Sequence, residues 1–149
     1  MRPEADHILL GACAELSASI APALPGDYAT GTLNLIGLMM FMVAGEYDRA
    51  ADVRHADIEA MRVLLRDGLA LVHDPSLRAT LEAASAATPA SLRISALDAV
   101  HDQMAAAIID LHAAVEARHD RTGEALATRI WSALVDMSDR HVPSLPSPT

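Results

Sequence analysis

The chain has 149 residues, of which 52% are hydrophobic and 3% aromatic, and its formal net charge is −9. This length suits one domain with a hydrophobic core of its own. All eleven basic residues are arginines scattered along an acidic chain, which repels phosphate backbones, so we expect no nucleic-acid partner.

Hydrophobic residues recur at helical spacing from the start of the chain. The first predicted helix presents an apolar face over residues 9–20 and ends at Pro22. Asp27 can cap the second helix, in which residues 33–44 are apolar on all sides. Because such a helix is usually buried all round, we expect it at the centre of a bundle or in a subunit interface.

Two proline signals mark the later helices. A polar stretch at 46–57 separates the second helix from a third one over 58–72. Asp74, followed by proline, predicts the cap of a short fourth helix. Thr88, also followed by proline, predicts the start of the longest helix, and Gly123 predicts its end.

A last amphipathic helix follows over 126–137, and Pro143 ends it. No strand-like alternation, repeat or linker appears, so the sequence predicts an all-α, single-domain bundle of five or six helices over residues 1–142. Residues 143–149 are predicted to be a disordered tail. The expected core draws on every long helix and contains Leu16, Ile20, Leu35, Leu65, Leu97, Met104, Ile108, Leu111 and Leu134.

The uncharged run at 28–45 raises the question of a membrane span, because its length reaches the lower limit for one. Thr32 and Asn34 interrupt this run, and acidic residues stand on both sides of it. We therefore expect a buried helix and no membrane partner. Cys13 is the only cysteine, so no intramolecular disulfide can form, and a reducing, cytoplasmic compartment fits.

Three histidines, His101, His112 and His119, lie in one row on the long predicted helix. His112, Glu116 and His119 are spaced so that all three could reach one metal ion. Di-iron bundles need a second Glu-x-x-His motif on another helix, and this chain has none. The alternative is that these histidines border the apolar face at the protein surface.

Glu46 ends the most apolar segment and is a candidate catalytic residue. In a cavity, desolvation would raise its pKa and suit it for acid–base work together with His101 or His112. The alternative is a glutamate paired with Arg49 or Arg54 at a helix end.

Met39, Met40 and Met42, beside Phe41, form a flexible apolar cluster. Methionine is common at adaptable binding surfaces, so these residues are candidates for a ligand pocket or a homodimer interface. The alternative is that they fill a core.

The first part of the chain also has a recognisable order. Arg2-Pro3 precedes an apolar helix, which is followed by A-P-A-L-P-G at 21–26 and a second apolar helix ending in V-A-G-E at 43–46. This order resembles a family of small bacterial all-helical proteins of unassigned function, encoded beside kinase-like phosphotransferases and acyl-CoA dehydrogenases. In that family a basic residue precedes the glutamate, where this chain has Gly45. The resemblance implies a bacterial cytoplasmic protein that is an accessory to acyl or phosphoryl metabolism. It also points to Glu46 as a candidate functional residue.

The motifs that identify common enzyme classes are missing from the sequence, among them the P-loop, H-E-x-x-H and G-x-S-x-G, and nothing indicates a cofactor. We therefore expect a non-catalytic accessory or small-molecule-binding protein that forms a homodimer or docks on a partner enzyme. The first alternative is a small lyase or isomerase that acts on an apolar substrate in a pocket within the bundle. The second alternative is a metal-binding bundle.

Overall fold

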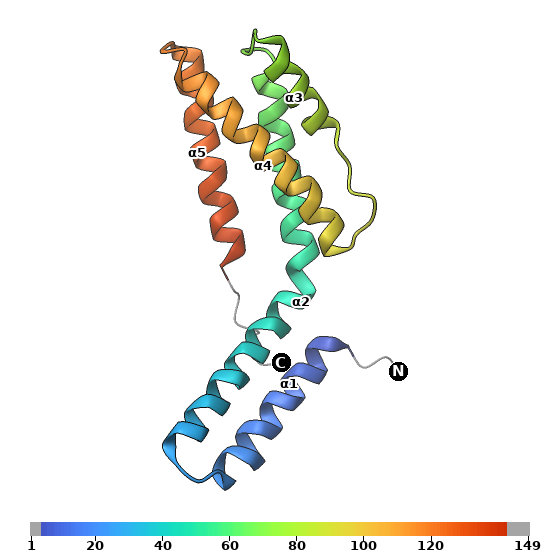
Figure 1. The fold of residues 1–149 in the computed structure, drawn as a ribbon, viewed down its shortest axis with the longest axis vertical. Helices are drawn as coiled ribbons and strands as arrows, with labels where there is room; N and C mark the ends of the chain where they lie inside the picture. The colour runs from blue at the N-terminus through green and yellow to red at the C-terminus, as the bar shows by residue number, and fades with distance from the viewer. Residues whose placement is uncertain (1–3, 143–149) are drawn as a thin grey trace. The chain divides into compact units, whose positions relative to one another are not determined.

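The computed structural model describes residues 4–142, and these residues form five α-helices and no strand, which confirms the all-α prediction (Figure 1). The predicted tail at 143–149 lies outside the described residues. The chain groups into two compact units, the first ending at Ala50 and the second spanning Ala51–Val142. The boundary falls inside a helix, so one helix contributes residues to both units.

The first unit is built from two helical segments. Helix α1 spans Ala5–Glu15 and continues as a π-helical turn over Leu16–Ile20 and a 3-10 turn over Ala21–Ala23. Gly26 then takes a φ of 92°, a left-handed conformation that glycine adopts without strain, and α2 begins at Asp27.

Helix α2 spans Asp27–Gly68, which is 42 residues without a break. The predicted separation at 46–57 is therefore wrong. These residues contain neither proline nor glycine, the two residue types that most disfavour a helix interior. Tyr47, Asp48, Asp52 and His55 form an exposed face of this helix, and polarity alone does not distinguish such a face from a loop.

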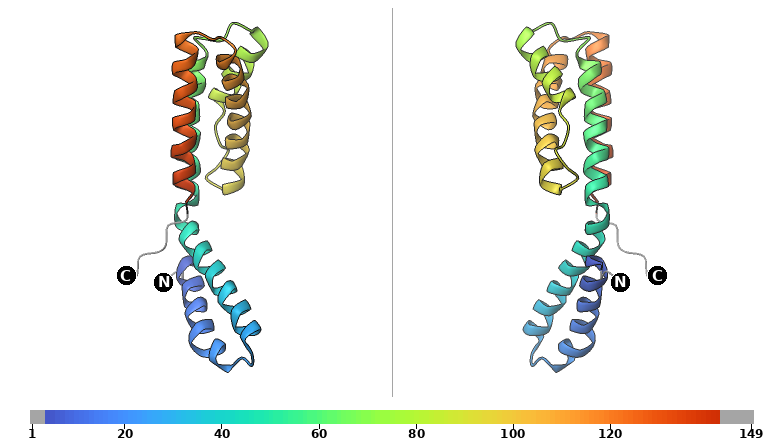
Figure 2. Two further views of the ribbon diagram at one scale, coloured as in Figure 1. Left: turned by 90° about the vertical axis from the view of Figure 1, so that its left-hand side faces the viewer. Right: turned by 90° about the vertical axis from the view of Figure 1, so that its right-hand side faces the viewer.

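The second unit contains the rest of α2 together with α3 (Pro75–Ala86), α4 (Ile94–Glu116) and α5 (Arg121–His141). The views in Figure 2 show α4 and α5 side by side, in agreement with the contacts between them. The predicted cap of α3 forms, because an Asp74 side-chain oxygen accepts a hydrogen bond of 2.7 Å from the Leu77 backbone N–H.

Helix α4 is shorter at both ends than the sequence predicts. It begins at Ile94 instead of Pro89, after a turn in which the Ser91 hydroxyl accepts a bond from the Arg93 backbone N–H. Side-chain bonds of this kind compete with helix formation. The helix ends at Glu116, and His119 has a φ of 50°, a left-handed conformation that stops a helix.

The hydrophobic core lies in the second unit. Five predicted core residues are buried there: Leu65, Leu97, Met104, Ile108 and Leu111. Leu16 is half-buried, whereas Ile20, Leu35 and Leu134 are exposed by 42%, 57% and 39%, so the prediction is wrong for these three. Ile20 and Leu35 belong to the first unit, outside the main buried cluster, and Leu134 lines a pocket.

Candidate functional site

An apolar pocket opens between α4 and α5 in the second unit, with a volume of about 210 Å³. Two histidines line it, His101 and His112, both on α4. The other lining residues are all apolar: Met61, Ala105, Ile108, Ile109, Ile130, Leu134 and Met137. Pockets for small molecules have this composition, with many apolar side chains and a few polar groups that fix orientation.

Packing and burial define the position of the His112 ring. It meets Trp131 of α5 edge to face, with ring centroids 5.3 Å apart and planes at 86°. Its Nε2 atom is buried and lies 3.5 Å from Glu116 Oε1. Within the described residues this nitrogen has no hydrogen-bond partner. His112 therefore lines the pocket while its Nε2 atom lies buried beside the Glu116 carboxylate.

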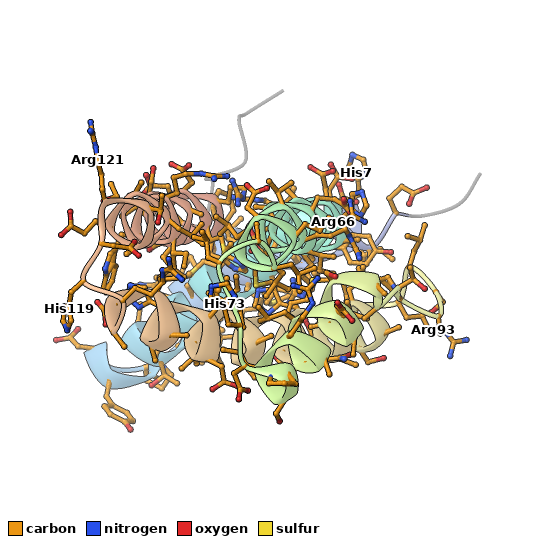
Figure 3. The ribbon with its side chains drawn as sticks, turned by 90° about the horizontal axis from the view of Figure 1, so that it is seen from above. His7, Arg66, His73, Arg93, His119 and Arg121 are labelled. Atoms are coloured by element: carbon orange, nitrogen blue, oxygen red, sulfur yellow. The ribbon has the colours of Figure 1, made fainter. Side chains whose placement is uncertain are left out.

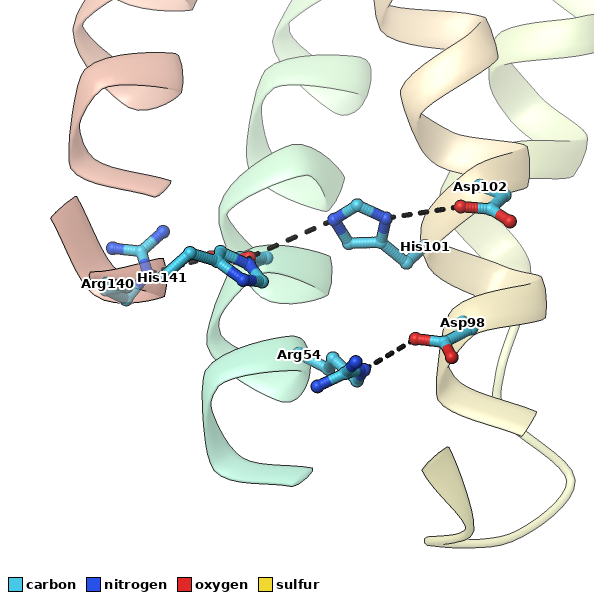
Figure 4. Close-up of polar contacts among 7 residues, drawn as sticks. Arg54, Asp98, His101, Asp102, Arg140 and His141 are labelled. Carbon is cyan, nitrogen blue, oxygen red and sulfur yellow. Dashed lines mark hydrogen bonds and ion pairs between the residues drawn. The ribbon is translucent and has the colours of Figure 1, made fainter. Parts of the chain in front are cut away.

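His101 lies between two carboxylates, as Figure 4 shows. Its Nδ1 is 3.6 Å from Asp102 Oδ1, and its Nε2 is 3.9 Å from Asp57 Oδ2. These distances exceed those of a hydrogen bond. The two imidazoles of the pocket thus share one feature, which is a carboxylate nearby and no hydrogen bond among the described contacts.

Asp57 of α2 is the centre of a buried ionic cluster. Its side chain is 0% exposed, and the two oxygens take different partners from the end of α5. Arg140 Nε donates to Oδ1 at 2.8 Å, and His141 Nε2 lies 2.7 Å from Oδ2. A second ion pair, between Arg54 and Asp98, joins α2 to α4 close by (Figure 4). The cluster ties α5 to α2 beside His101.

Asp57 was not among the functional residues predicted from the sequence. A signal was present, because Asp57 stands one position before Ile58 and four before Met61 on the apolar face of the helix. A carboxylate on a buried face needs positive or hydrogen-bonding partners. Those partners, Arg140 and His141, are more than eighty residues away along the chain, so no local pattern indicates them.

The predicted metal triad does not form a row in the structure. His112 and Glu116 are on α4, but His119 lies in the turn beyond its end, because the helix stops at Glu116. Figure 3 shows the His119 side chain directed away from the helices. No group of three or more histidine, cysteine, aspartate or glutamate side chains in residues 4–142 is arranged to hold a metal ion.

Glu46, the other predicted catalytic residue, is half-buried and belongs to the first unit. His101 and His112 belong to the second unit. The structure thus brings the two histidines to one pocket, and the pairing of Glu46 with them stays a prediction.

The N-terminal half of α2 carries an apolar surface in the first unit. Within residues 28–45, only Gly37 and Ala44 are buried. The expectation of a helix buried on all sides is therefore wrong for the chain by itself. An 18-residue window of α2 has a mean hydropathy of 1.4 and is 11% buried, so this helix could cross a membrane by length and composition.

The four residues of the predicted interface divide between two faces of α2. Met40 and Phe41 are half-buried, whereas Met39 and Met42 are exposed by 60% and 42%. Contact with α1 is close at Gly37, whose carbonyl oxygen accepts a bond of 3.3 Å from the Cys13 thiol.

Comparison with known proteins gives no match: no family model, no curated protein and no solved structure resembles this chain closely enough. The resemblance inferred from the sequence therefore stays a prediction.

Proposed function

We propose that this protein is a non-catalytic helical accessory protein that acts as a homodimer through the exposed face of α2. The observation that carries the proposal is a row of large apolar side chains on the first unit. Leu35, Leu38 and Met42 are exposed by 57%, 51% and 42%, and Met39 and Val43 beside them by 60% and 55%. We call these five residues the assembly surface. An apolar patch of this kind on a folded protein marks an interaction site.

The spacing on this surface favours another helix as its partner. Leu35, Leu38 and Met42 follow one another by three and four residues, which is the heptad spacing of paired helices. A second copy of the chain carries the same apolar stripe, so a matching partner is present wherever the protein is. Apolar, methionine-containing surfaces of this kind are typical of homodimer interfaces.

Two polar residues weigh against lipid as the partner. Asn34 is exposed on α2. Glu15 is exposed on α1, two residues after the Cys13 that contacts Gly37, so it lies level with the middle of the apolar run. An acidic side chain at the centre of a bilayer costs about 2.5–3.5 kcal/mol.

We assign the protein to the bacterial cytoplasm, as the family resemblance implies, with an enzyme of acyl or phosphoryl metabolism as a further partner.

The proposal is tested by the mass of the full-length chain in solution. Light scattering at micromolar concentration should give twice the 15.8 kDa of one chain. Leu38→Asp places a charge in the assembly surface and should give a monomer with unchanged helix content. Leu92→Asp is the matched control, because Leu92 is 81% exposed and lies in the second unit, so this variant should remain a dimer.

Three outcomes would contradict the proposal. The first is a monomeric wild-type chain, and the second is a Leu38→Asp variant that dimerises as tightly as the wild type. The third is flotation of the wild-type chain with phosphatidylcholine vesicles that Leu38→Asp abolishes, since lipid would then be the partner of the surface.

A further inference from the structure

The geometry points to a second role, in the second unit, as a binding site for a small uncharged apolar molecule of about the size of one hydrocarbon ring. The site is the pocket between α4 and α5. Its lining residues all lie between Met61 and Met137, whereas the assembly surface lies within residues 35–43 of the first unit. The inference therefore does not depend on the proposed homodimer.

The chemistry of the lining sets the class of ligand. Seven of the nine lining residues are apolar, and the other two are His101 and His112. His112 Nε2 is inaccessible and lies beside Glu116, which does not line the pocket, so a ligand does not reach this nitrogen. The nitrogens of His101 lie beside carboxylates, at 3.6 Å from Asp102 and 3.9 Å from Asp57. A polar ligand would lose its hydrogen bonds to water and regain few, so the lining favours an apolar one.

The size of the pocket sets the size of the ligand. Its volume is about 210 Å³. Protein interiors are close-packed, and spaces much larger than a water molecule are few in a domain. A cavity of about 150 Å³ lined by aliphatic and aromatic side chains stays dry and binds benzene. The present pocket therefore accommodates a single ring with one or two methyl groups.

The pocket extends from the core to the surface of the second unit. Met61 and Ile130 are 2% and 0% exposed, whereas Ile109 and Leu134 are exposed by 68% and 39%. A ligand can thus enter from solvent and reach side chains of the core without unfolding of the bundle. Met61 and Met137 are flexible side chains that can adapt to the shape of the molecule that enters.

Binding is driven by the removal of apolar surface from water. The pocket exposes core side chains to solvent on one side, and their burial by a ligand is favourable in proportion to the apolar area covered. Ala105 lines the pocket with the smallest side chain of the set, where a larger residue would fill the space. Position 105 is therefore the place at which the pocket can be closed by substitution.

The test measures binding of p-xylene to the full-length chain by calorimetry. The matched probe is 4-methylphenol, which replaces one methyl group by a hydroxyl of similar size. The wild-type chain should bind p-xylene about tenfold more tightly than 4-methylphenol, because the hydroxyl loses its hydration in the apolar pocket. The anion 4-methylbenzoate should bind more weakly than either neutral probe.

Ala105→Leu places a larger apolar side chain in the pocket and should weaken p-xylene binding at least about tenfold, because the remaining space is too small for the ring. The control is Ala106→Leu, the same substitution at the next residue of α4, which is exposed and does not line the pocket. This variant should bind p-xylene as the wild type does.

A measurement on the wild-type chain needs no variant to fold. The methyl resonances of Met61 and Met137 should shift on addition of p-xylene, whereas those of Met39 and Met42 in the assembly surface should not. Leu38→Asp, which is designed to abolish the dimer, should leave p-xylene binding unchanged, which separates this test from that of the proposed function.

Four results would overturn the inference. They are no binding of p-xylene at its solubility limit, undiminished binding by a folded Ala105→Leu variant, tighter binding of 4-methylphenol or 4-methylbenzoate than of p-xylene, and shifts confined to Met39 and Met42.

Discussion

At the residue scale, the most strongly constrained side chain is Asp57. It is an ionised group without solvent exposure, and its two oxygens bind Arg140 and His141. Burying a carboxylate costs several kcal/mol, which such partners offset when both oxygens are bonded. The partners are 33% and 45% exposed themselves, so the cluster lies where the end of α5 meets α2 and water reaches only one side.

Asp57→Ala should lower the free energy of unfolding by about 2–4 kcal/mol, because two charge-assisted hydrogen bonds are lost and Arg140 is left beside an apolar core. Urea denaturation followed by circular dichroism measures the change. Asp110→Ala, at an exposed position of α4, should alter stability by less than about 0.5 kcal/mol. Equal effects of the two substitutions would show that the cluster contributes nothing to folding.

Asp120 gives the protein a pH dependence that can be traced to one group. The Gly123 backbone N–H, the Thr122 hydroxyl and the Arg118 guanidinium all bond its carboxylate, and they hold its pKa well below the usual range. An ionised carboxylate is thus favoured more in the folded chain than in the unfolded one. Its contribution to stability is complete above the unfolded pKa, about 3.9, and is lost as the pH falls toward the folded pKa.

Asp120→Asn should therefore be less stable than the wild type at neutral pH, and the difference should shrink as the pH falls below about 4. Urea midpoints measured in parallel for the two proteins between neutral and acidic pH provide the comparison. A difference that stays constant over this range would mean that the charge of Asp120, the N-cap residue of α5, does not contribute to stability.

At the element scale, helix ends depend on contacts that the sequence shows only in part. Gly123 was predicted to end a helix, but it lies in the first turn of α5 and donates its N–H to Asp120 Oδ1 at 2.8 Å. A Cβ at this position would lie 2.5 Å from the Val115 carbonyl oxygen. The absence of a side chain at Gly123 allows a close approach of α5 to the end of α4, and this glycine does not end a helix.

Gly123→Ala should destabilise the protein by about 1–3 kcal/mol, the usual cost of overpacking, although alanine is the better helix former. Gly11→Ala is the matched control. Position 11 is also helical and has no atom within 4 Å of an added Cβ, so alanine should be neutral or stabilising there, by up to about 1 kcal/mol. Thermal unfolding of both variants decides the matter, and stabilisation by Gly123→Ala would contradict the close approach.

At the scale of the whole molecule, the apolar residues divide unequally between core and surface. Every residue of the main buried cluster belongs to the second unit, between Ile58 and Met137. In the first unit two helical segments pack on each other, and one face of α2 keeps its leucines, methionines and valine exposed. This exposed face is an apolar surface that the core of one chain does not cover, which is the reason for proposing a second copy as the partner.

The sequence alone determined the helical class, because alanine- and leucine-rich periodicity is a local property. It also determined the start of α3 at Asp74, since an N-cap acts over three residues. For the candidate site, the spacing on one helix placed His101 and His112 beside its apolar face, without showing which residues face them.

The tertiary structure alone decided which apolar faces are covered and which polar groups meet. The two histidines share a pocket because α5 packs on α4, and Asp57 is neutralised because the end of α5 reaches α2. Helix α2 is continuous through a polar stretch, and its first half is exposed despite being apolar. Burial and charge pairing depend on residues far apart in the chain, whereas periodicity reports only on near neighbours, so these features required the folded arrangement of the helices.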